Sequence, residues 1–471
     1  MKVPSDILRV YKALHTWTGI VAGLVLFIGF FAGALTMFKQ PLDRWASRPV
    51  VAASHETSLP VPGDTLLPQL LAAHPRAEKD LRVYIRRDES HPAPASWQEG
   101  RDGHGLDLQV PRWQASLADN GTLWVEPVQP SPVGKLVDQL HRTAGIPGHV
   151  AGESVGVYVM GVAAVLYFLA IVSGLILLLP TLVKDFFALR NGTNRKRFWL
   201  DAHNVIGITS LPFHIVISLT VIVFAFHDQF YEALGGVVYR GQAMFTPPAA
   251  AAKPYQPSQL MPLSTLVSKV QARAPGFDVS ELRFMNLASK RPIMRAALTS
   301  SRHVVHGPDS AYLMLNPYTG EVVNDSMLPG RENGWIAPVN TFFALHFGSY
   351  GGDAVRWVYF ALGLGGALLF YSGNLLWIES RRKRARRGEP RAVAQTRSVR
   401  WMAAATVGNA TGCVAGVALA LVVGMWVKVA GHSSTGVYMP VYYACYLGAL
   451  LTAGVCGAAR AAVPLLQLCA V

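Results

Sequence analysis

Six stretches of this chain are almost continuously apolar, and each is long enough to cross a lipid bilayer as a helix. A transmembrane helix needs about 20 predominantly apolar residues. The composition agrees, because 51% of the 471 residues are hydrophobic and only 15% are charged, a balance typical of an integral membrane protein and not of a soluble enzyme. The six predicted spans lie at residues 13–38, 153–179, 203–226, 354–378, 402–428 and 437–459.

Two long polar insertions separate the spans, at residues 40–152 and 227–353. Each carries an amphipathic helical pattern followed by a strand pattern, in GDTLLPQLLAAHPRAEKDLRVYIRR and in PLSTLVSKVQARAPGFDVSELRF. Each continues with a hairpin, around Asn120 and around Thr319. We therefore predict an α-helical integral membrane protein with about six transmembrane helices and two α+β domains. The predicted boundaries are 1–39 (first span), 40–152 (first domain), 153–183 (second span), 184–202 (loop), 203–226 (third span), 227–353 (second domain), 354–379 (fourth span), 380–401 (basic loop) and 402–471 (last two spans and tail).

Basic residues concentrate in two of the short connections. The loop at 184–202 carries five lysine and arginine residues, and the loop at 380–401 carries nine. The positive-inside rule predicts that both loops are cytoplasmic. Both termini are then cytoplasmic as well, and the two insertions lie on the outer side. The net charge of +14 is explained by this topology and by attraction to anionic membrane lipids, so no nucleic-acid partner is predicted.

Five histidines lie inside or at the border of the apolar stretches, where an ionisable side chain is rare and marks a functional position by default. His15 and His203 open two spans at matched depth, and His141 and His346 each follow a leucine just before two further spans. His214 lies inside the third span. It follows His203 by eleven residues, which on a straight helix returns to nearly the same face about 16 Å away. A set of histidines shared among several helices indicates a bound metal or haem.

The same positions indicate an internal repeat between residues 1–190 and 195–385. In both halves the first histidine is followed by a glycine four residues later, the insertion ends in a Leu-His pair, and the next span contains a Ser-Gly pair. Both copies begin on the same side of the membrane, so we predict a parallel repeat about an axis along the membrane normal. The glycines are Gly19 and Gly207, and the Ser-Gly pairs are Ser173-Gly174 and Ser372-Gly373.

In this order, the motifs resemble the PepSY-associated transmembrane family of bacterial inner-membrane proteins. The resemblance rests on LHTWTGIVAG, LHRTAG, DAHNVIG, LNPYTGEVV and LHFGSYGG, followed by Ser-Gly-x-x-x-Trp at 372–377, and it covers about the first 385 residues. It implies a multi-pass protein of the bacterial inner (cytoplasmic) membrane whose insertions are periplasmic PepSY-like domains. Some members are similar to ferric-siderophore reductases that bind b-type haems. The fused flavodoxin or flavin-reductase region of some relatives has no counterpart in this sequence.

A six-coordinate haem takes two axial ligands, commonly imidazoles from different helices. We predict two molecules of haem b. His15 and His203, equivalent by the repeat, are the predicted ligands of an inner haem. For the outer haem His346 is the first candidate, and its partner is left open: helical geometry favours His214, whereas the repeat favours His141.

The predicted function is a transmembrane oxidoreductase. Electrons from a cytoplasmic or quinol donor pass both haems and reduce a ferric siderophore or another ferric chelate in the periplasm. Arg142 is a candidate for binding a haem propionate or an anionic group of the substrate, and no catalytic residue is named, because no HExxH or P-loop motif occurs. Two alternatives remain: a non-redox, membrane-anchored PepSY protein that binds or modulates a peptidase, and a proton-coupled transporter.

Overall fold

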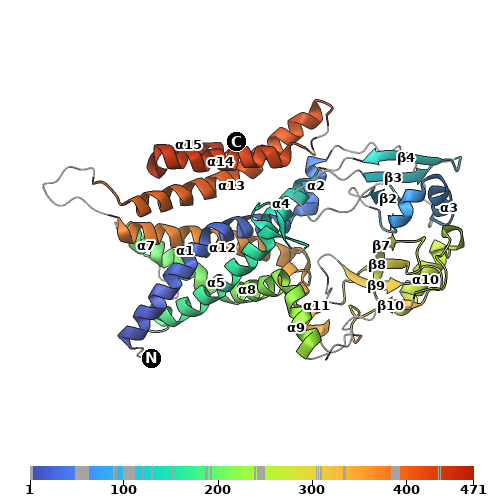
Figure 1. Ribbon diagram of the computed structural model, residues 1–471, viewed down its shortest axis with the longest axis horizontal. Coiled ribbons are helices and arrows are strands. Elements are labelled where there is room, and N and C mark those ends of the chain that lie inside the picture. Colours follow the sequence, from blue (N-terminus) through green and yellow to red (C-terminus); the bar gives the residue numbers. More distant parts are fainter. Residues whose placement is uncertain are drawn as a thin grey trace.

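The structure is a computed structural model of the 471-residue chain. It describes residues 4–47, 63–87, 91, 93–98, 112–118, 120–128, 131–150, 152–185, 189–190, 194–237, 240, 250–303, 305, 307, 310–331, 336–382, 393–432, 434 and 436–470. Most of the basic run predicted at 380–401 lies outside these residues. Figure 1 shows a bundle of long helices at one end of the molecule and a β-sheet at the other.

Five helices are long and apolar enough to cross a membrane in the part of the chain that the structure describes, and a bent helix pair brings the number up to six. This confirms the prediction of a multi-pass helical membrane protein. Helix α1 packs against α5 and α12 and also contacts α13. The five long helices are α1 (Ser5–Thr36), α5 (Val155–Leu178), α12 (Gly352–Arg381), α13 (Arg397–Val429) and α14 (Tyr438–Cys456).

The span predicted at 203–226 is broken in the structure. It consists of α7 (Arg195–Thr209) and α8 (Leu211–Ala225), which are bent by 71° at Ser210. Pro212 occupies the first turn of α8. A proline there lacks the N–H that would continue the helix, and its ring clashes with the carbonyl four residues earlier. The straight helix from which the spacing of His203 and His214 was estimated is therefore absent at this position.

Short helices lie between the long ones and carry part of the candidate site. Helix α4 (Val133–Thr143) contains His141, and α11 (Ile336–Phe347) contains His346. Helix α4 contacts α1, α5 and α2, so the bundle fixes its position. The other short helices are α2 (Lys39–Ala46), α6 (Leu182–Asp185), α9 (His227–Val237) and α15 (Ala458–Leu468).

The two polar insertions form one antiparallel sheet of eight strands in the order β10-β9-β8-β7-β1-β2-β3-β4. Helices α3 (Gly63–Ala73) and α10 (Leu263–Arg273) contact each other and share the apolar core of this sheet. The strands are β1 (Asp80–Tyr84), β2 (Ala95–Gln98), β3 (Arg112–Leu117), β4 (Leu123–Val128), β7 (Asp278–Met285), β8 (Ile293–Thr299), β9 (Ala311–Leu315) and β10 (Val322–Asn324), and a separate short pair is formed by β5 (His149–Val150) and β6 (Glu153–Ser154).

The first insertion joins the second through the antiparallel pair β1–β7, in which Arg82 lies opposite Arg283. Arg283 donates from Nε and Nη2 to the two carboxylate oxygens of Asp80, both at 2.6 Å. Leu81 and Leu282, one from each insertion, are fully buried in a common core. The sequence predicted a separate domain for each insertion, and the structure differs, because pairing β1 with β7 covers two strand edges that would otherwise be exposed.

Candidate functional site

His15 of α1 and His203 of α7 lie side by side in the helix bundle. Their ring centroids are 6.2 Å apart and the ring planes are nearly perpendicular, at 80°. Two imidazoles from positions 188 residues apart in sequence therefore share one small space between helices. These are the two residues that the sequence predicts as a pair.

Neighbouring helices hold these two rings through Nδ1. His15 donates to the carbonyl of Ala170 at 2.8 Å, and His203 donates to Oγ of Ser372 at 3.0 Å. Ser372 gives its own proton to the carbonyl of Leu369, so its oxygen accepts from His203. Both imidazoles therefore carry the proton on Nδ1 and leave the Nε2 lone pair for another partner.

The Ser-Gly pairs explain how the rings come so close to α5 and α12. A Cβ at Gly174 would lie 2.9 Å from Cε1 of His15, and a Cβ at Gly373 would lie 3.3 Å from Cε1 of His203. Contacts this short leave little room for a larger side chain. Each Ser-Gly pair of the sequence thus makes room for one histidine of the pair.

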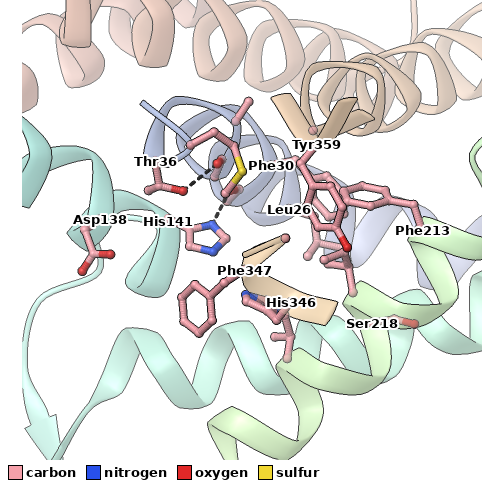
Figure 2. A pocket seen from close by; sticks show the side chains of 18 of the residues that line it. Leu26, Phe30, Thr36, Asp138, His141, Phe213, Ser218, His346, Phe347 and Tyr359 are labelled. Atoms are coloured by element: carbon pink, nitrogen blue, oxygen red, sulfur yellow. Dashed lines mark hydrogen bonds between the residues drawn. The ribbon is translucent and has the colours of Figure 1, made fainter. Parts of the chain in front are cut away.

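His141 of α4 and His346 of α11 form a second pair, with ring centroids 5.9 Å apart and an interplanar angle of 35°. Figure 2 shows the two rings pointing toward one another from their separate helices. The structure thus brings His346 together with His141, the partner that the repeat favoured, and places His214 elsewhere.

The second pair is held in the same way as the first. His141 donates from Nδ1 to the carbonyl of Gly29, and His346 donates from Nδ1 to Oγ1 of Thr220, both at 2.8 Å. Thr220 donates its proton to the carbonyl of Val216 and therefore accepts from His346. A Cβ at Gly33 would lie 2.7 Å from Nδ1 of His141, so α1 also needs a glycine where a histidine packs.

The spacing of both pairs fits a metal held between two imidazoles. A metal–nitrogen bond of about 2.0–2.1 Å on each side separates the ring centroids by about 6 Å, close to the 6.2 Å and 5.9 Å observed. Histidines that bind a metal almost always donate their other N–H to a fixed acceptor, as all four do here. Among the residues that the structure describes, no group of three or more His, Cys, Asp or Glu side chains is arranged to hold a metal ion. Haem iron needs only two ligands from the protein.

A cavity that is partly open to solvent adjoins the second pair, and both His141 and His346 line it. Its walls combine apolar and aromatic side chains with a few charged ones at Lys39, Asp138 and Arg356. Figure 2 shows Phe213 and Tyr359 on the side of the cavity away from His141. A mainly apolar pocket with a few polar groups is typical of a cofactor or ligand site.

His214 is 1% exposed and lies in a cage of the three aromatic rings of Phe30, Tyr167 and Phe213, with centroid distances of 5.6–5.9 Å. Its Nε2 lies 2.7 Å from Oγ of Ser210. The bend at Ser210 directs α8 away from the axis of α7. His214 is thus held by a serine of its own chain segment and faces no second histidine.

Arg142 is exposed and does not line the cavity, although it follows His141 directly. The positive charges at the cavity come from Lys39 and Arg356 instead. Arg356 also pairs with Asp353 at 3.1 Å. The sequence analysis did not identify Lys39 or Arg356 as site residues. Their one distinguishing feature in the sequence is that each lies at the end of a predicted span.

Asp43 of α2 fixes the start of α4, the helix that carries His141. Its Oδ1 accepts from the backbone N–H of Gly134 at 2.6 Å, which satisfies one of the free donors of the helix N-terminus. A Cβ at residue 134 would collide with this carboxylate, so glycine is required for the contact. Burial raises the pKa of Asp43 to about 6, against the lowering effect of the Gly134 hydrogen bond and of nearby Lys39.

Comparison with protein families found one match that covers most of the chain. The model of the PepSY-associated TM region matches residues 12–380. This range includes both histidine pairs and both insertions, and it ends before α13. A comparison with curated proteins found no match.

Proposed function

This chain belongs to the PepSY-associated TM region family, and we propose that it is a haem-b electron-transfer protein that reduces ferric chelates, such as a ferric siderophore. The observation that carries the proposal is the presence of two close imidazole pairs, in which each of the four rings is hydrogen-bonded through Nδ1. One such pair is the protein's share of a six-coordinate haem site. Two pairs support two haems.

In this proposal His15 and His203 hold the first haem, and His141 and His346 hold the second. A haem with two imidazole ligands supplies reversible one-electron transfer at its iron. The residues around it determine how well this works: Ser372 and Thr220 fix the tautomer and orientation of two of the rings. A fixed acceptor on Nδ1–H also makes the imidazole a stronger donor toward iron.

The charged groups of the cavity suit an anionic ligand. Lys39 and Arg356 line its wall, and so does Asp138. Arginine and lysine bind carboxylates through charge-assisted hydrogen bonds, and haem propionates and many ferric chelates carry carboxylates. The two cations would therefore attract such groups into the cavity that His141 and His346 line.

Topology completes the proposal. We infer that both termini and the basic loop at 380–401 are cytoplasmic, that the shared sheet is periplasmic, and that the membrane is the bacterial inner membrane. An internal parallel repeat accounts for two observations: the contacts of His15 with Gly174 and of His203 with Gly373 match, and β1 pairs with β7 through equivalent Leu-Arg segments.

The test is an optical spectrum of the purified full-length protein from haem-replete cells. We expect a b-type spectrum with about two haems per chain. The variants His203→Ala and His346→Ala each lose one haem, whereas the control His227→Ala keeps both, because His227 bonds only to Phe224 and Asp228 of its own segment. A second measurement completes the assignment. After reduction by dithionite, the unchanged protein should reduce the ferric chelate, and neither haem-deficient variant should. A colourless protein would contradict the proposal.

A further inference from the structure

His141 lies on a helix that is too short to keep its position alone. Helix α4 has 11 residues, and isolated helices of this length are marginal even in favourable sequences. Its N-cap residue, Pro132, offers no side-chain acceptor to the free N–H groups of the first turn. His15, by contrast, lies on the 32-residue helix α1. The position of His141 therefore depends on what α4 contacts.

Two tyrosines of α14 hydrogen-bond to the two ends of α4. Oη of Tyr438 shares a hydrogen bond of 2.8 Å with Oγ of Ser131, which directly precedes the N-cap residue of α4. Oη of Tyr443 donates at 2.6 Å to the carbonyl of Gly145, which directly follows the C-cap residue. Between these ends, Leu140 of α4 lies in the same buried apolar cluster as Tyr438. Helix α14 thus holds α4 at both ends.

Helix α13 fixes α14 to the rest of the bundle. Asn409 of α13 donates from Nδ2 to the carbonyl of Leu24 in α1 at 3.1 Å, and Oη of Tyr446 in α14 donates to Oδ1 of Asn409 at 2.8 Å. A Cβ at Gly424 of α13 would collide with the ring of Tyr438. Glycine thus lets α13 and α14 approach closely, as small residues commonly do between helices in membranes. The tyrosines that reach α4 therefore extend from a helix pair that is itself bonded to α1.

A third contact reaches α4 through the short helix α2. Nζ of Lys428, in the last turn of α13, donates to the carbonyl of Ala46 at the end of α2. Asp43 of α2 accepts from the backbone N–H of Gly134 in the first turn of α4. Helices α13 and α14 therefore support α4 directly at its two ends and indirectly through α2.

This support acts on the second histidine pair. His141 lies two residues before the end of α4, so a shift of this helix moves its ring relative to the carbonyl of Gly29 and to the ring of His346. The acceptors that hold His15 and His203 lie on α5 and α12 instead. A change at the contacts between α14 and α4 should therefore affect one pair and spare the other.

We propose that Tyr438 and Tyr443 are positioning residues for His141, and that α13 and α14 thereby set the haem affinity and the orientation of the rings at the second histidine pair. The inference rests on the proposed function, which places a haem at this pair. It gives a role to two long helices that follow residue 380, where the match to the family model ends.

The experiment compares the full-length protein in lipid nanodiscs with the double variant Tyr438→Phe/Tyr443→Phe, by haem titration and by electron paramagnetic resonance. Phenylalanine keeps both rings and removes both hydroxyls. The resonance of a ferric haem depends on the angle between its two imidazole planes, so the angles of 80° and 35° distinguish the first pair from the second. Because two hydrogen bonds are lost, we expect the haem affinity of the second pair to fall about tenfold and its resonance to shift, with the first haem unchanged.

The matched control is Tyr442→Phe, at a buried tyrosine of the same helix whose Oη has no hydrogen-bond partner among the described residues. It should leave both haems unchanged. An unaltered second haem in the double variant overturns the inference, and so does an equal change at both haems, which would mean a general weakening of the bundle. Hydrogen exchange of the α4 amides in the same samples needs no haem. A colourless protein contradicts the proposed function, and the exchange then decides the inference separately: faster exchange of α4 in the double variant alone supports it, and equal exchange in all three proteins overturns it.

Discussion

His203 donates from Nδ1 to the hydroxyl of Ser372 at 3.0 Å, whereas His15, its partner in the pair, donates to the backbone carbonyl of Ala170. The two halves of the site are thus held by a side chain in one case and by the main chain in the other. Ser173, which occupies the corresponding Ser-Gly pair near His15, bonds only to carbonyls of its own helix. This difference separates two serines that look alike in the sequence.

Under the proposed function, Ser372→Ala should weaken haem binding at the first pair, whereas Ser173→Ala should not. Without its acceptor, Nδ1–H of His203 no longer orients the ring or strengthens the imidazole as a donor, and losing such a partner costs 10–100-fold in metal affinity. The midpoint potential of this haem should rise, because a weaker donor stabilises ferric iron less. Haem titration of the apoprotein and a redox titration measure both effects. Equal affinities in the two variants would show that the hydroxyl of Ser372 is not used.

Under the proposed function, Gly33→Ala should reduce haem occupancy at the second pair. The added Cβ would lie 2.7 Å from Nδ1 of His141, a separation that forces the ring away from its hydrogen bond to Gly29. Gly19→Ala is the matched control on the same helix, because nothing lies within 4 Å of a Cβ there. We expect the haem content to fall in Gly33→Ala only, as measured by the pyridine haemochrome spectrum. A loss in both variants would point to a general weakening of α1.

Asp43→Asn should change how stability depends on pH. Because burial raises the pKa of Asp43 from its ordinary value of 3.8 to about 6, the folded protein holds a proton between these pH values that the unfolded chain has released. This contribution to the free energy of unfolding is fully present below about pH 4 and is lost as pH rises through 6, with a size of about 1–3 kcal/mol. Asparagine keeps an oxygen for the N–H of Gly134 and does not titrate. Chemical unfolding between pH 4 and 8 should therefore show a smaller decrease of the free energy of unfolding with rising pH in the variant than in the unchanged protein.

Leu81→Ala should destabilise both insertions together. Leu81 is fully buried in the core that the two insertions share, and a leucine-to-alanine change in such a core costs about 2–5 kcal/mol. Hydrogen exchange of the backbone amides should accelerate in β9 of the second insertion as well as in β3 of the first. Val322→Ala, at a side chain that is 42% exposed, should leave exchange unchanged. Acceleration confined to the first insertion would mean that the two halves unfold independently.

The sequence was sufficient to predict those elements that depend only on residues close together in the chain. Runs of apolar residues predicted the long helices, and helical patterns predicted α3 and α10, because both depend on neighbouring residues. The break between α7 and α8 was less visible: Pro212 is a known helix breaker, but the apolar run continues past it. The spacing of eleven residues therefore predicted that His203 and His214 lie on the same face of one straight helix, whereas the helix is bent by 71° between them.

Contacts between distant segments were harder to predict. The proposed repeat led to the expectation that His15 lies next to His203, because matched depth and an axis between the halves would bring equivalent residues together, and the two rings are 6.2 Å apart. The pairing of β1 with β7 was missed, because nothing in the sequence of either strand specifies which distant strand lies beside it. The acceptors on Ser372 and Thr220 were missed for the same reason. The sequence around a hydroxyl in an apolar helix does not specify which residue will hydrogen-bond to it.

The pairing of β1 with β7 also sets the order of events when the protein is made. Strand β1 ends at Tyr84 and β7 begins at Asp278, so the ribosome adds close to 200 residues, including α5, α7 and α8, before the partner strand exists. At about 5–20 residues per second this takes roughly 10–40 seconds. Throughout that time the first insertion lacks the strand that covers the edge of β1, and it also lacks the residues with which the second insertion completes the shared apolar core. Its survival in the cell thus depends on how fast the following helices enter the membrane, and variants that delay their insertion should be degraded even when every residue of the sheet is intact.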